Sequence, residues 1–196
     1  MLDWDGTVTE RDTLDLVLER FGDAEIYERA EAELERGTMT LNDVIAAEFA
    51  SVTAPLDEVV ACVVADARVR PGFTELARSR RPLVVSSGFH ELIEPVLERK
   101  GVLGEVELRA NRVDARPDGW RVLFRGVPAC AVCGEPCKRA DLPDGEIAYA
   151  GDGYSDYCAA LAADRVFATG SLARYLDERG VPYEPLTDFS ALASAL

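Results

Sequence analysis

The stretch "MLDWDGT", residues 1–7, decides how the chain is interpreted, because it sets two carboxylates one residue apart. In an extended strand Asp3 and Asp5 point to the same side, and Gly6 directly behind them lets a ligand approach the backbone. Converging carboxylates repel each other unless a cation or a substrate uses them. The stretch therefore predicts a strand that ends in a ligand site.

The first strand would be short. Only Met1 and Leu2 precede Asp3, whereas a strand usually has about 5 residues. We therefore expect the natural start of the chain to lie a few residues upstream.

Length and charge limit the class of protein. The chain has 196 residues and a formal net charge of -15, which suits one core domain with an inserted subdomain. The acidic excess argues against nucleic acid as a partner, because no basic stripe is present to release counterions. Without a long apolar run or a basic segment ahead of one, we expect no membrane partner. Five cysteines, without the pattern of a disulfide framework, favour a reducing cytoplasm.

Residues 12–70 are expected to form a small helical subdomain, inserted into a discontinuous core of residues 1–11 and 71–196. Residues 10–70 hold 15 Asp and Glu against 6 Arg and Lys, so this subdomain is acidic. Thr40 to Asp43 reads as a capping box. Apolar residues share one helical face at Leu41, Val44, Ile45 and Phe49, and again at Leu56, Val59, Val60, Val63 and Val64. These patterns predict a small bundle of helices.

The remainder alternates short apolar strands with helical segments. Strands are expected at Leu83 to Val85, Ile147 to Ala150 and Val166 to Ala168, and a hairpin between Val106 and Phe124 about the turn 116–119. Parallel strands joined by helices form a doubly wound α/β sheet, whose ligands bind at the carboxyl ends of the strands.

Candidate site residues follow each of three predicted strands. Carboxylates, a serine hydroxyl, backbone amides opened by glycine and one lysine suit Mg²⁺ with a phosphoryl group, since the cation prefers oxygen ligands and the phosphate needs donors. The members of this set are Asp3 and Asp5, then Ser86, Ser87 and Gly88, then Lys138, and finally Gly151 to Asp156.

Asp-x-Asp-Gly-Thr at 3–7, Ser86, Lys138 and Gly-Asp-Gly-x-Ser-Asp at 151–156 together resemble the four motifs of the haloacid dehalogenase superfamily of phosphatases. The helical insert directly after the first motif is similar to the cap of its phosphoserine-phosphatase-like branch. The tail from residue 166 and the Cys-Lys pair at 137–138 look more like the branch that contains a phosphatase of methionine salvage. The resemblance implies a Rossmann-like core with a helical cap.

The resemblance also implies a role for each matched residue. Asp3 would attack phosphorus and form an aspartyl-phosphate, and Asp5 would act as general acid and base. Lys138 would offset negative charge. Phosphate would be held by Ser86, Ser87 and Gly88, Mg²⁺ by Asp3, the Asp5 carbonyl and Asp152, and the site would be oriented by Asp156.

The segment "CAVCGEPCK" predicts a partial zinc site. Cys130, Cys133 and Cys137 have x2 and x3 spacings, and a fourth ligand is left open among Cys158, Cys62 and His90. The alternative is a loop with reduced thiols. If Zn²⁺ binds, we expect it to brace the loop that carries Lys138.

The expected activity is hydrolysis of a small phosphorylated metabolite in the cytoplasm. Within this class the substrate could belong to methionine salvage, or be phosphoserine or a small amino-alcohol phosphate. The alternative from another class is a non-catalytic metal-binding or interaction protein on the same fold. Retention of Asp3, Asp5, Lys138 and Asp152 together favours the enzyme.

Overall fold

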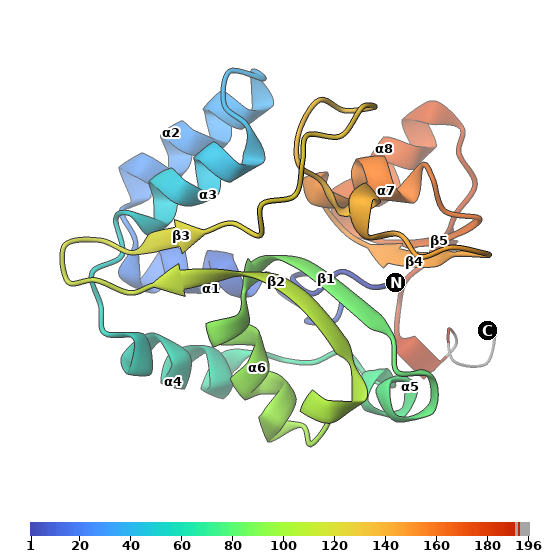
Figure 1. Cartoon of the computed structure of the whole chain (residues 1–196), viewed down its shortest axis with the longest axis horizontal. Helices are drawn as coiled ribbons and strands as arrows, with labels where there is room; N and C mark the ends of the chain where they lie inside the picture. The colour runs from blue at the N-terminus through green and yellow to red at the C-terminus, as the bar shows by residue number, and fades with distance from the viewer. Residues whose placement is uncertain (191, 193–196) are drawn as a thin grey trace.

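A central sheet organises the fold (Figure 1). The structure is a computed structural model that describes residues 1–190 and 192. The strands lie in the order β3-β2-β1 and β4-β5-β6, and Leu2 joins the two groups through parallel bridges to Val84 and Ala150. β2 and β3 pair antiparallel, whereas the pairs β1–β2, β4–β5 and β5–β6 are parallel. The strands are β1 (Leu83–Phe89), β2 (Glu107–Asp114), β3 (Arg121–Leu123), β4 (Ala148–Gly151), β5 (Arg165–Ala168) and β6 (Glu184–Pro185).

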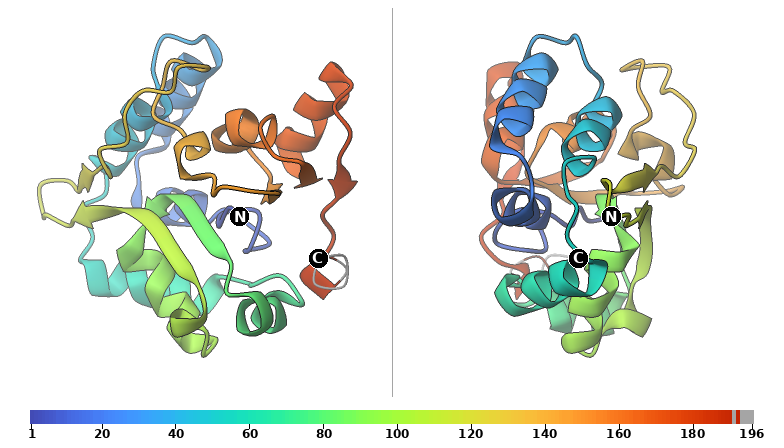
Figure 2. Two further views of the ribbon diagram at one scale, coloured as in Figure 1. Left: turned by 45° about the vertical axis from the view of Figure 1, so that its right-hand side comes forward. Right: turned by 90° about the vertical axis from the view of Figure 1, so that its left-hand side faces the viewer.

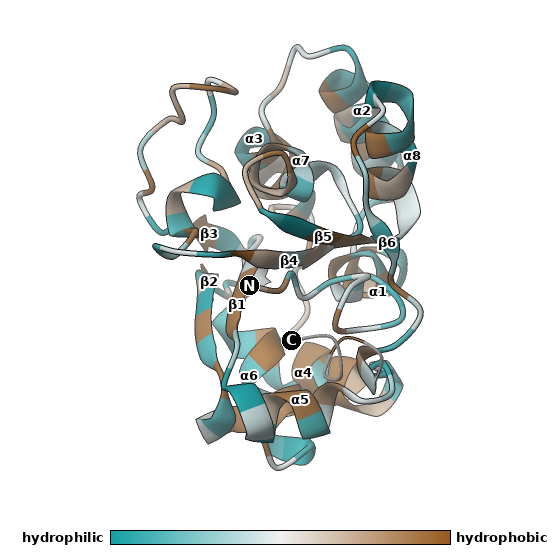
Figure 3. Cartoon of the chain, turned by 90° about the vertical axis from the view of Figure 1, so that its right-hand side faces the viewer, coloured by the Kyte–Doolittle hydropathy of each residue, from teal (hydrophilic) through white to brown (hydrophobic). Residues whose placement is uncertain are grey.

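Helices cover both faces of this sheet. Figure 3 shows α7 and α8 on one side of β4 and β5, and α4, α5 and α6 on the other. None of the helices in the described part of the chain is long and apolar enough to cross a membrane. The helices are α1 (Thr13–Phe21), α2 (Ala24–Glu35), α3 (Leu41–Phe49), α4 (Leu56–Asp66), α5 (Phe73–Arg80), α6 (His90–Arg99), α7 (Tyr157–Ala160) and α8 (Gly170–Arg179), with short 3₁₀ helices at Leu103–Glu105, Lys138–Asp141 and Tyr154–Asp156.

Side chains that alternate along the strands build two hydrophobic clusters. Ala150 and Phe167 join the larger cluster, which includes buried residues of α4, α5 and α6. Their neighbours Tyr149 and Val166 join the smaller cluster, with buried residues of α7 and α8. Successive residues of a strand face opposite sides, so each strand contributes to both layers. The predicted doubly wound α/β core is confirmed.

The helical segment does not form one separate bundle. α2 and α3 pack together, whereas α4 packs against α6 of the core, and Figure 2 shows α2 and α3 far from α4. The core therefore buries the apolar face of α4, and Val59 and Val63 belong to the larger cluster. α2 and α3 are the part of the insertion that projects from the core as a cap, and the bounds 12–70 of a cap subdomain stay a prediction.

Several local predictions are confirmed. α3 begins with a capping box between Thr40 and Asp43, and α4 begins after Pro55. The hairpin exists as β2 and β3. Its Trp120 side chain donates from Nε1 to the carbonyl oxygen of Ala54 at 2.9 Å, so the hairpin is anchored to the link between α3 and α4.

β1 extends beyond the predicted strand, and this corrects the position of the serine segment. Val85 pairs with Arg109 and Phe89 pairs with Asn111, so four steps along β1 match two along β2. The segment 86–88 is therefore a bulge inside β1 rather than a loop after it. In a bulge, side chains and backbone amides turn away from the hydrogen bonds between strands. This segment therefore faces the carboxyl ends of the other strands.

Candidate active site

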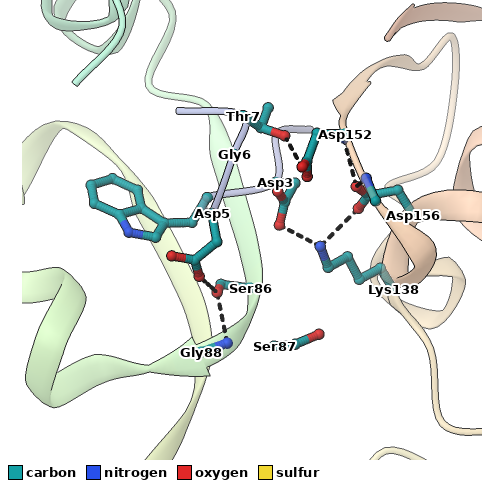
Figure 4. A network of polar contacts seen from close by, with 12 residues as sticks. Asp3, Asp5, Gly6, Thr7, Ser86, Ser87, Gly88, Lys138, Asp152 and Asp156 are labelled. Carbon is teal, nitrogen blue, oxygen red and sulfur yellow. Dashed lines mark hydrogen bonds and ion pairs between the residues drawn. The ribbon is translucent and has the colours of Figure 1, made fainter. Parts of the chain in front are cut away.

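Strand ends bring side chains from distant parts of the sequence into one polar network (Figure 4). Asp3 follows Leu2, Ser86 lies in the bulge of β1, and Asp152 follows β4. Lys138 reaches the same point from the start of a 3₁₀ helix. The residues predicted from the three strand ends are therefore neighbours in space.

Lys138 is the centre of the network. Its Nζ donates to Asp3 Oδ1, and to Asp156 Oδ1 at 2.7 Å. The lysine is 4% exposed. Burial acts to lower the pKa of Lys138, but the carboxylates of Asp156 and Asp3 outweigh it and raise that pKa above its usual range. The lysine therefore stays charged.

Asp156 uses both carboxylate oxygens inside the protein. Oδ1 accepts from Lys138 and, at 2.6 Å, from the Tyr149 hydroxyl. Oδ2 accepts from the backbone N–H groups of Asp152 and Gly153 at 2.9 and 3.1 Å. Asp156 is therefore suited to orient the loop that carries Asp152 and has little capacity left to bind a ligand.

Asp5 lies on the other side of the network. Its Oδ1 accepts from the backbone N–H of Thr13 at 2.9 Å and from the Thr13 hydroxyl, and Ser86 Oγ donates to Oδ2 at 3.3 Å. Ser86 Oγ also accepts from the backbone N–H of Gly88 at 2.8 Å. Burial raises the pKa of Asp5, although the bonds from Thr13 oppose this. A raised pKa favours a protonated carboxyl that can act as an acid.

The carboxylate oxygens fit a hard cation. Single oxygens of Asp3 and Asp152 lie within 4.8 Å of each other, and an oxygen of Asp156, which already accepts hydrogen bonds within the protein, lies within the same distance of both. Burial raises the pKa of Asp3 well above its usual value, and burial followed by the Asp156 charge raises that of Asp152 to about 7. A bound divalent cation would stabilise the ionised forms. An oxygen-only donor set of this kind is the one that Mg²⁺ prefers.

Gly6 brings the backbone against the Asp152 carboxylate. Its φ is +70°, and a Cβ there would lie well inside contact distance of Asp152 Oδ2. Arg70 holds this turn, since its guanidinium donates to the carbonyl oxygens of Gly6 and Thr7 at 3.0 and 2.9 Å. The Thr7 hydroxyl donates to Asp152 Oδ1 at 3.4 Å. The turn therefore defines one wall of the proposed cation site.

Sequence reasoning missed several residues of the network. Thr13 and Tyr149 bind Asp5 and Asp156, and Arg70 holds the turn after Asp5. None of them belongs to a motif. Ser87, which was predicted, lies beside the network in Figure 4, and its carbonyl accepts from the Asn111 side chain at 2.8 Å.

The structure identifies which candidate joins the three clustered cysteines. Cys158 lies with Cys130, Cys133 and Cys137. Cys62 instead accepts a hydrogen bond from Arg20, and His90 pairs with Glu94 inside α6.

The comparisons of this chain with known proteins agree on one family. Residues 1–161 match the family model of haloacid dehalogenase-like hydrolases. The 2-hydroxy-3-keto-5-methylthiopentenyl-1-phosphate phosphatase of Geobacillus thermodenitrificans (strain NG80-2) is 26% identical, over 95% of this chain and 90% of that protein. Pdp3-interacting factor 1 of Schizosaccharomyces pombe is 24% identical, over 96% and 90%. A solved phospho-aspartyl intermediate analogue of phosphoserine phosphatase aligns with a TM-score of 0.71 at 16% identity, covering 100% of this chain and 96% of that one.

The fold and the family match define the class of protein: the chain belongs to the haloacid dehalogenase-like hydrolases. Within that family it is an enzyme of the phosphatase class, similar in sequence to the methylthiopentenyl-phosphate phosphatases and in fold to the phosphoserine phosphatases. The alternative of a non-catalytic binding protein is set aside.

Gly6→Ala should reduce phosphatase activity by at least ten-fold, because the new methyl group displaces the Asp152 carboxylate. Gly37→Ala is the matched control, since Gly37 has a φ of +67° but a methyl group there would have open space around it to 4 Å. In both variants alanine must adopt a positive φ, which lowers the free energy of unfolding by ~1–2 kcal/mol. Thermal unfolding measures this loss. Equal activity in the two variants would show that the turn does not position Asp152.

Proposed function

We propose that the protein is a Mg²⁺-dependent phosphomonoesterase that hydrolyses a small cytoplasmic metabolite through an aspartyl-phosphate. The observation that carries this proposal is the ion pair of Lys138 with Asp3 inside a buried group of carboxylates, with Asp5 two residues further along the chain. Phosphoryl transfer depends mainly on positioning and charge stabilisation, which such a network supplies.

Asp3 is proposed as the nucleophile. Lys138 donates to Asp3 Oδ1 and so favours the charged carboxylate that attack requires. A new bond forms between an Asp3 oxygen and phosphorus, and the bond from phosphorus to the substrate oxygen breaks. Lys138 then offsets charge on the transferring group.

Asp5 is proposed to move the protons. In the first step it gives its proton to the departing substrate oxygen. In the second step it takes a proton from water as the water attacks phosphorus, which releases phosphate and restores Asp3. The Thr13 amide and hydroxyl hold the Asp5 carboxyl in one orientation for both steps.

The phosphoryl oxygens are proposed to bind at the bulge of β1. Ser87 would supply donors there, and the Ser86 hydroxyl and Gly88 N–H, now paired with Asp5 and with Ser86, would exchange these partners for phosphoryl oxygens. Glycine at position 88 keeps the approach open, because a Cβ would lie 3.0 Å from Asp5 Oδ2. Mg²⁺, held by Asp3, Asp152 and the Asp5 carbonyl oxygen, would supply positive charge to the phosphoryl group.

Asp3→Asn should abolish hydrolysis of p-nitrophenyl phosphate, and Asp5→Asn should nearly abolish it, because each removes a group that forms a bond or moves a proton. Asp144→Asn is the control, since Asp144 is an exposed carboxylate. Phosphate release is measured with and without Mg²⁺. Full activity of either site variant, or equal rates after removal of divalent cations, would contradict the mechanism.

The cavity beside Asp3 and Asp5 suggests a property of the substrate. It has a volume of about 230 Å³ and contains no basic side chain among the described residues that line it. Four carboxylates of the helical insertion line it, namely Asp12, Asp15, Glu31 and Glu48. A small substrate with a positive group would therefore be attracted into it.

Glu48 gives this suggestion a specific contact. It is 5% exposed, and its Oε1 has no hydrogen-bond partner in the described part of the chain. An ammonium group could supply the missing partner. Phosphoserine would also bring a carboxylate among the acidic side chains, whereas an amino-alcohol phosphate would not. We therefore infer that an amino-alcohol phosphate fits this cavity better than phosphoserine.

A second cavity supports the other candidate, a substrate with no charged group besides its phosphate, such as that named for the methylthiopentenyl-phosphate phosphatases. It has a volume of about 460 Å³ and extends from Lys138 and Ser87 to Tyr154, Tyr157 and Leu161. These aromatic and aliphatic walls could hold an apolar tail.

Glu48→Gln should distinguish the two candidates. If the substrate is aminated, we expect kcat/KM for phosphoethanolamine to fall about ten-fold, equivalent to ~1.4 kcal/mol, with little change for p-nitrophenyl phosphate. Glu58→Gln is the control, because Glu58 is an exposed carboxylate on α4. Equal loss for both substrates would contradict a role in binding the amine.

The same variant should change the pH dependence of stability. Burial, followed by the charges of Glu31 and Asp15, raises the pKa of Glu48 to about 8 from 4.5. The contribution of Glu48 to the free energy of unfolding is therefore most favourable below about pH 4.5, where the side chain is protonated, and is lost as the pH rises to about 8. Glu48→Gln should increase the free energy of unfolding by up to roughly 4 kcal/mol at pH 8 and by little at pH 4.5. Urea unfolding at the two pH values tests this, and a constant difference would contradict it.

A further inference from the structure

Four cysteine side chains from two separate segments meet beside the carboxylate network. The Sγ atoms of Cys130, Cys133, Cys137 and Cys158, here called the cysteine cluster, all lie within 4.8 Å of one another. The first three lie in the segment between β3 and the 3₁₀ helix of Lys138, and the fourth lies in α7. The cluster therefore joins parts of the chain that are about twenty residues apart.

The separation of the sulfurs suits a tetrahedral metal site. All four thiols are free, and the Sγ atoms of Cys130 and Cys158 are 3.9 Å apart. A disulfide needs about 2.05 Å. Four sulfurs at a Zn–S distance of ~2.3 Å form a tetrahedron with edges of ~3.8 Å, close to the separation observed.

The backbone around Cys130 is arranged as a tight turn about its sulfur. The N–H of Val132 points to Cys130 Sγ at 3.4 Å, which stabilises a thiolate there. The Cys130 N–H donates to the Glu135 carbonyl at 2.9 Å, and the Gly134 N–H donates to the Cys130 carbonyl at 2.8 Å. Two ligands from one such turn, a third shortly after it and a fourth from a helix form a common arrangement of structural zinc.

We propose that the cysteine cluster binds one structural Zn²⁺ through four thiolates, at a site separate from the carboxylate site. Soft thiolates select zinc over Mg²⁺, and each thiol releases its proton to solvent on binding. Four thiolates fill the tetrahedral shell, so the ion has no open position for a substrate.

The zinc ion would position the catalytic lysine. Cys137 directly precedes Lys138, and Cys158 lies two residues after Asp156. The ion would therefore tie together the two segments whose side chains form the 2.7 Å contact between Lys138 Nζ and Asp156 Oδ1. Residues 127–137 contain no helix or strand, so the ion would hold this segment in place where no regular secondary structure does so.

Metal analysis of the full chain, purified without added metal, is the direct test. We expect one zinc ion per chain in the native protein and in Cys62→Ser, whose altered thiol lies outside the cluster, and less than a tenth of that in Cys158→Ser. Replacement of zinc by Co²⁺ should give the intense visible absorption of a tetrahedral thiolate site. Iron in place of zinc, an octahedral Co²⁺ spectrum, or full zinc content in Cys158→Ser would overturn the assignment.

A second measurement on the unmodified protein does not depend on the folding of a variant. Titration of its thiols with a mercurial reagent should release zinc in proportion to the thiols that react, detected with a metal-sensitive dye. Zinc loss should lower kcat for p-nitrophenyl phosphate about ten-fold with KM little changed. Unchanged kcat after zinc loss would overturn the positioning role, while an inactive native protein that still holds zinc would contradict the proposed phosphatase mechanism alone.

Discussion

The ion pair between Lys138 and the two carboxylates of Asp3 and Asp156 is the interaction on which the site depends. All three side chains are nearly inaccessible to solvent, and burial of an unpaired charge costs several kcal/mol. One lysine cannot balance the carboxylates gathered at the strand ends. The remaining negative charge is the physical reason why this part of the protein suits a cation, and loss of one partner of the ion pair would leave the others with an unbalanced buried charge.

Residues that are distant in the sequence form this ion pair because the fold brings them together. Leu2 places the short first segment between β1 and β4, so that Asp3 emerges beside the loop after β4. Asp156 then fixes that loop through the backbone N–H groups of Asp152 and Gly153. Sheet pairing therefore holds the first segment and the bulge of β1, whereas the loop after β4 is held by the site residue Asp156.

The end of β4, the capping box and the hairpin could be predicted from the sequence because each depends on a few neighbouring residues, whereas the end of β1 could not, because its bulge depends on pairing with β2. The contacts of Thr13 with Asp5 and of Tyr149 with Asp156 could not, since they arise only when separate elements pack together. For the same reason an apolar face on α4 indicated a buried helix but not that its partner is α6. The fourth cysteine, Cys158, was one of three candidates that spacing alone could not separate.

The two cavities adjoin each other, and this has a consequence for the specificity of the proposed phosphatase. They share Leu41, Ser87, Tyr154 and Ser155, and the backbone N–H of Leu41 reaches Glu135 of the cysteine segment at 3.4 Å. A substrate bound in these cavities would therefore lie between the cap and the cysteine segment. Because Lys138 is already paired with Asp3 and Asp156, no positive charge remains among the described residues that line the cavities to attract a second anionic group. Repulsion by the cap carboxylates would then exclude polyanionic phosphates, while the shape of the walls selects among the small substrates that remain.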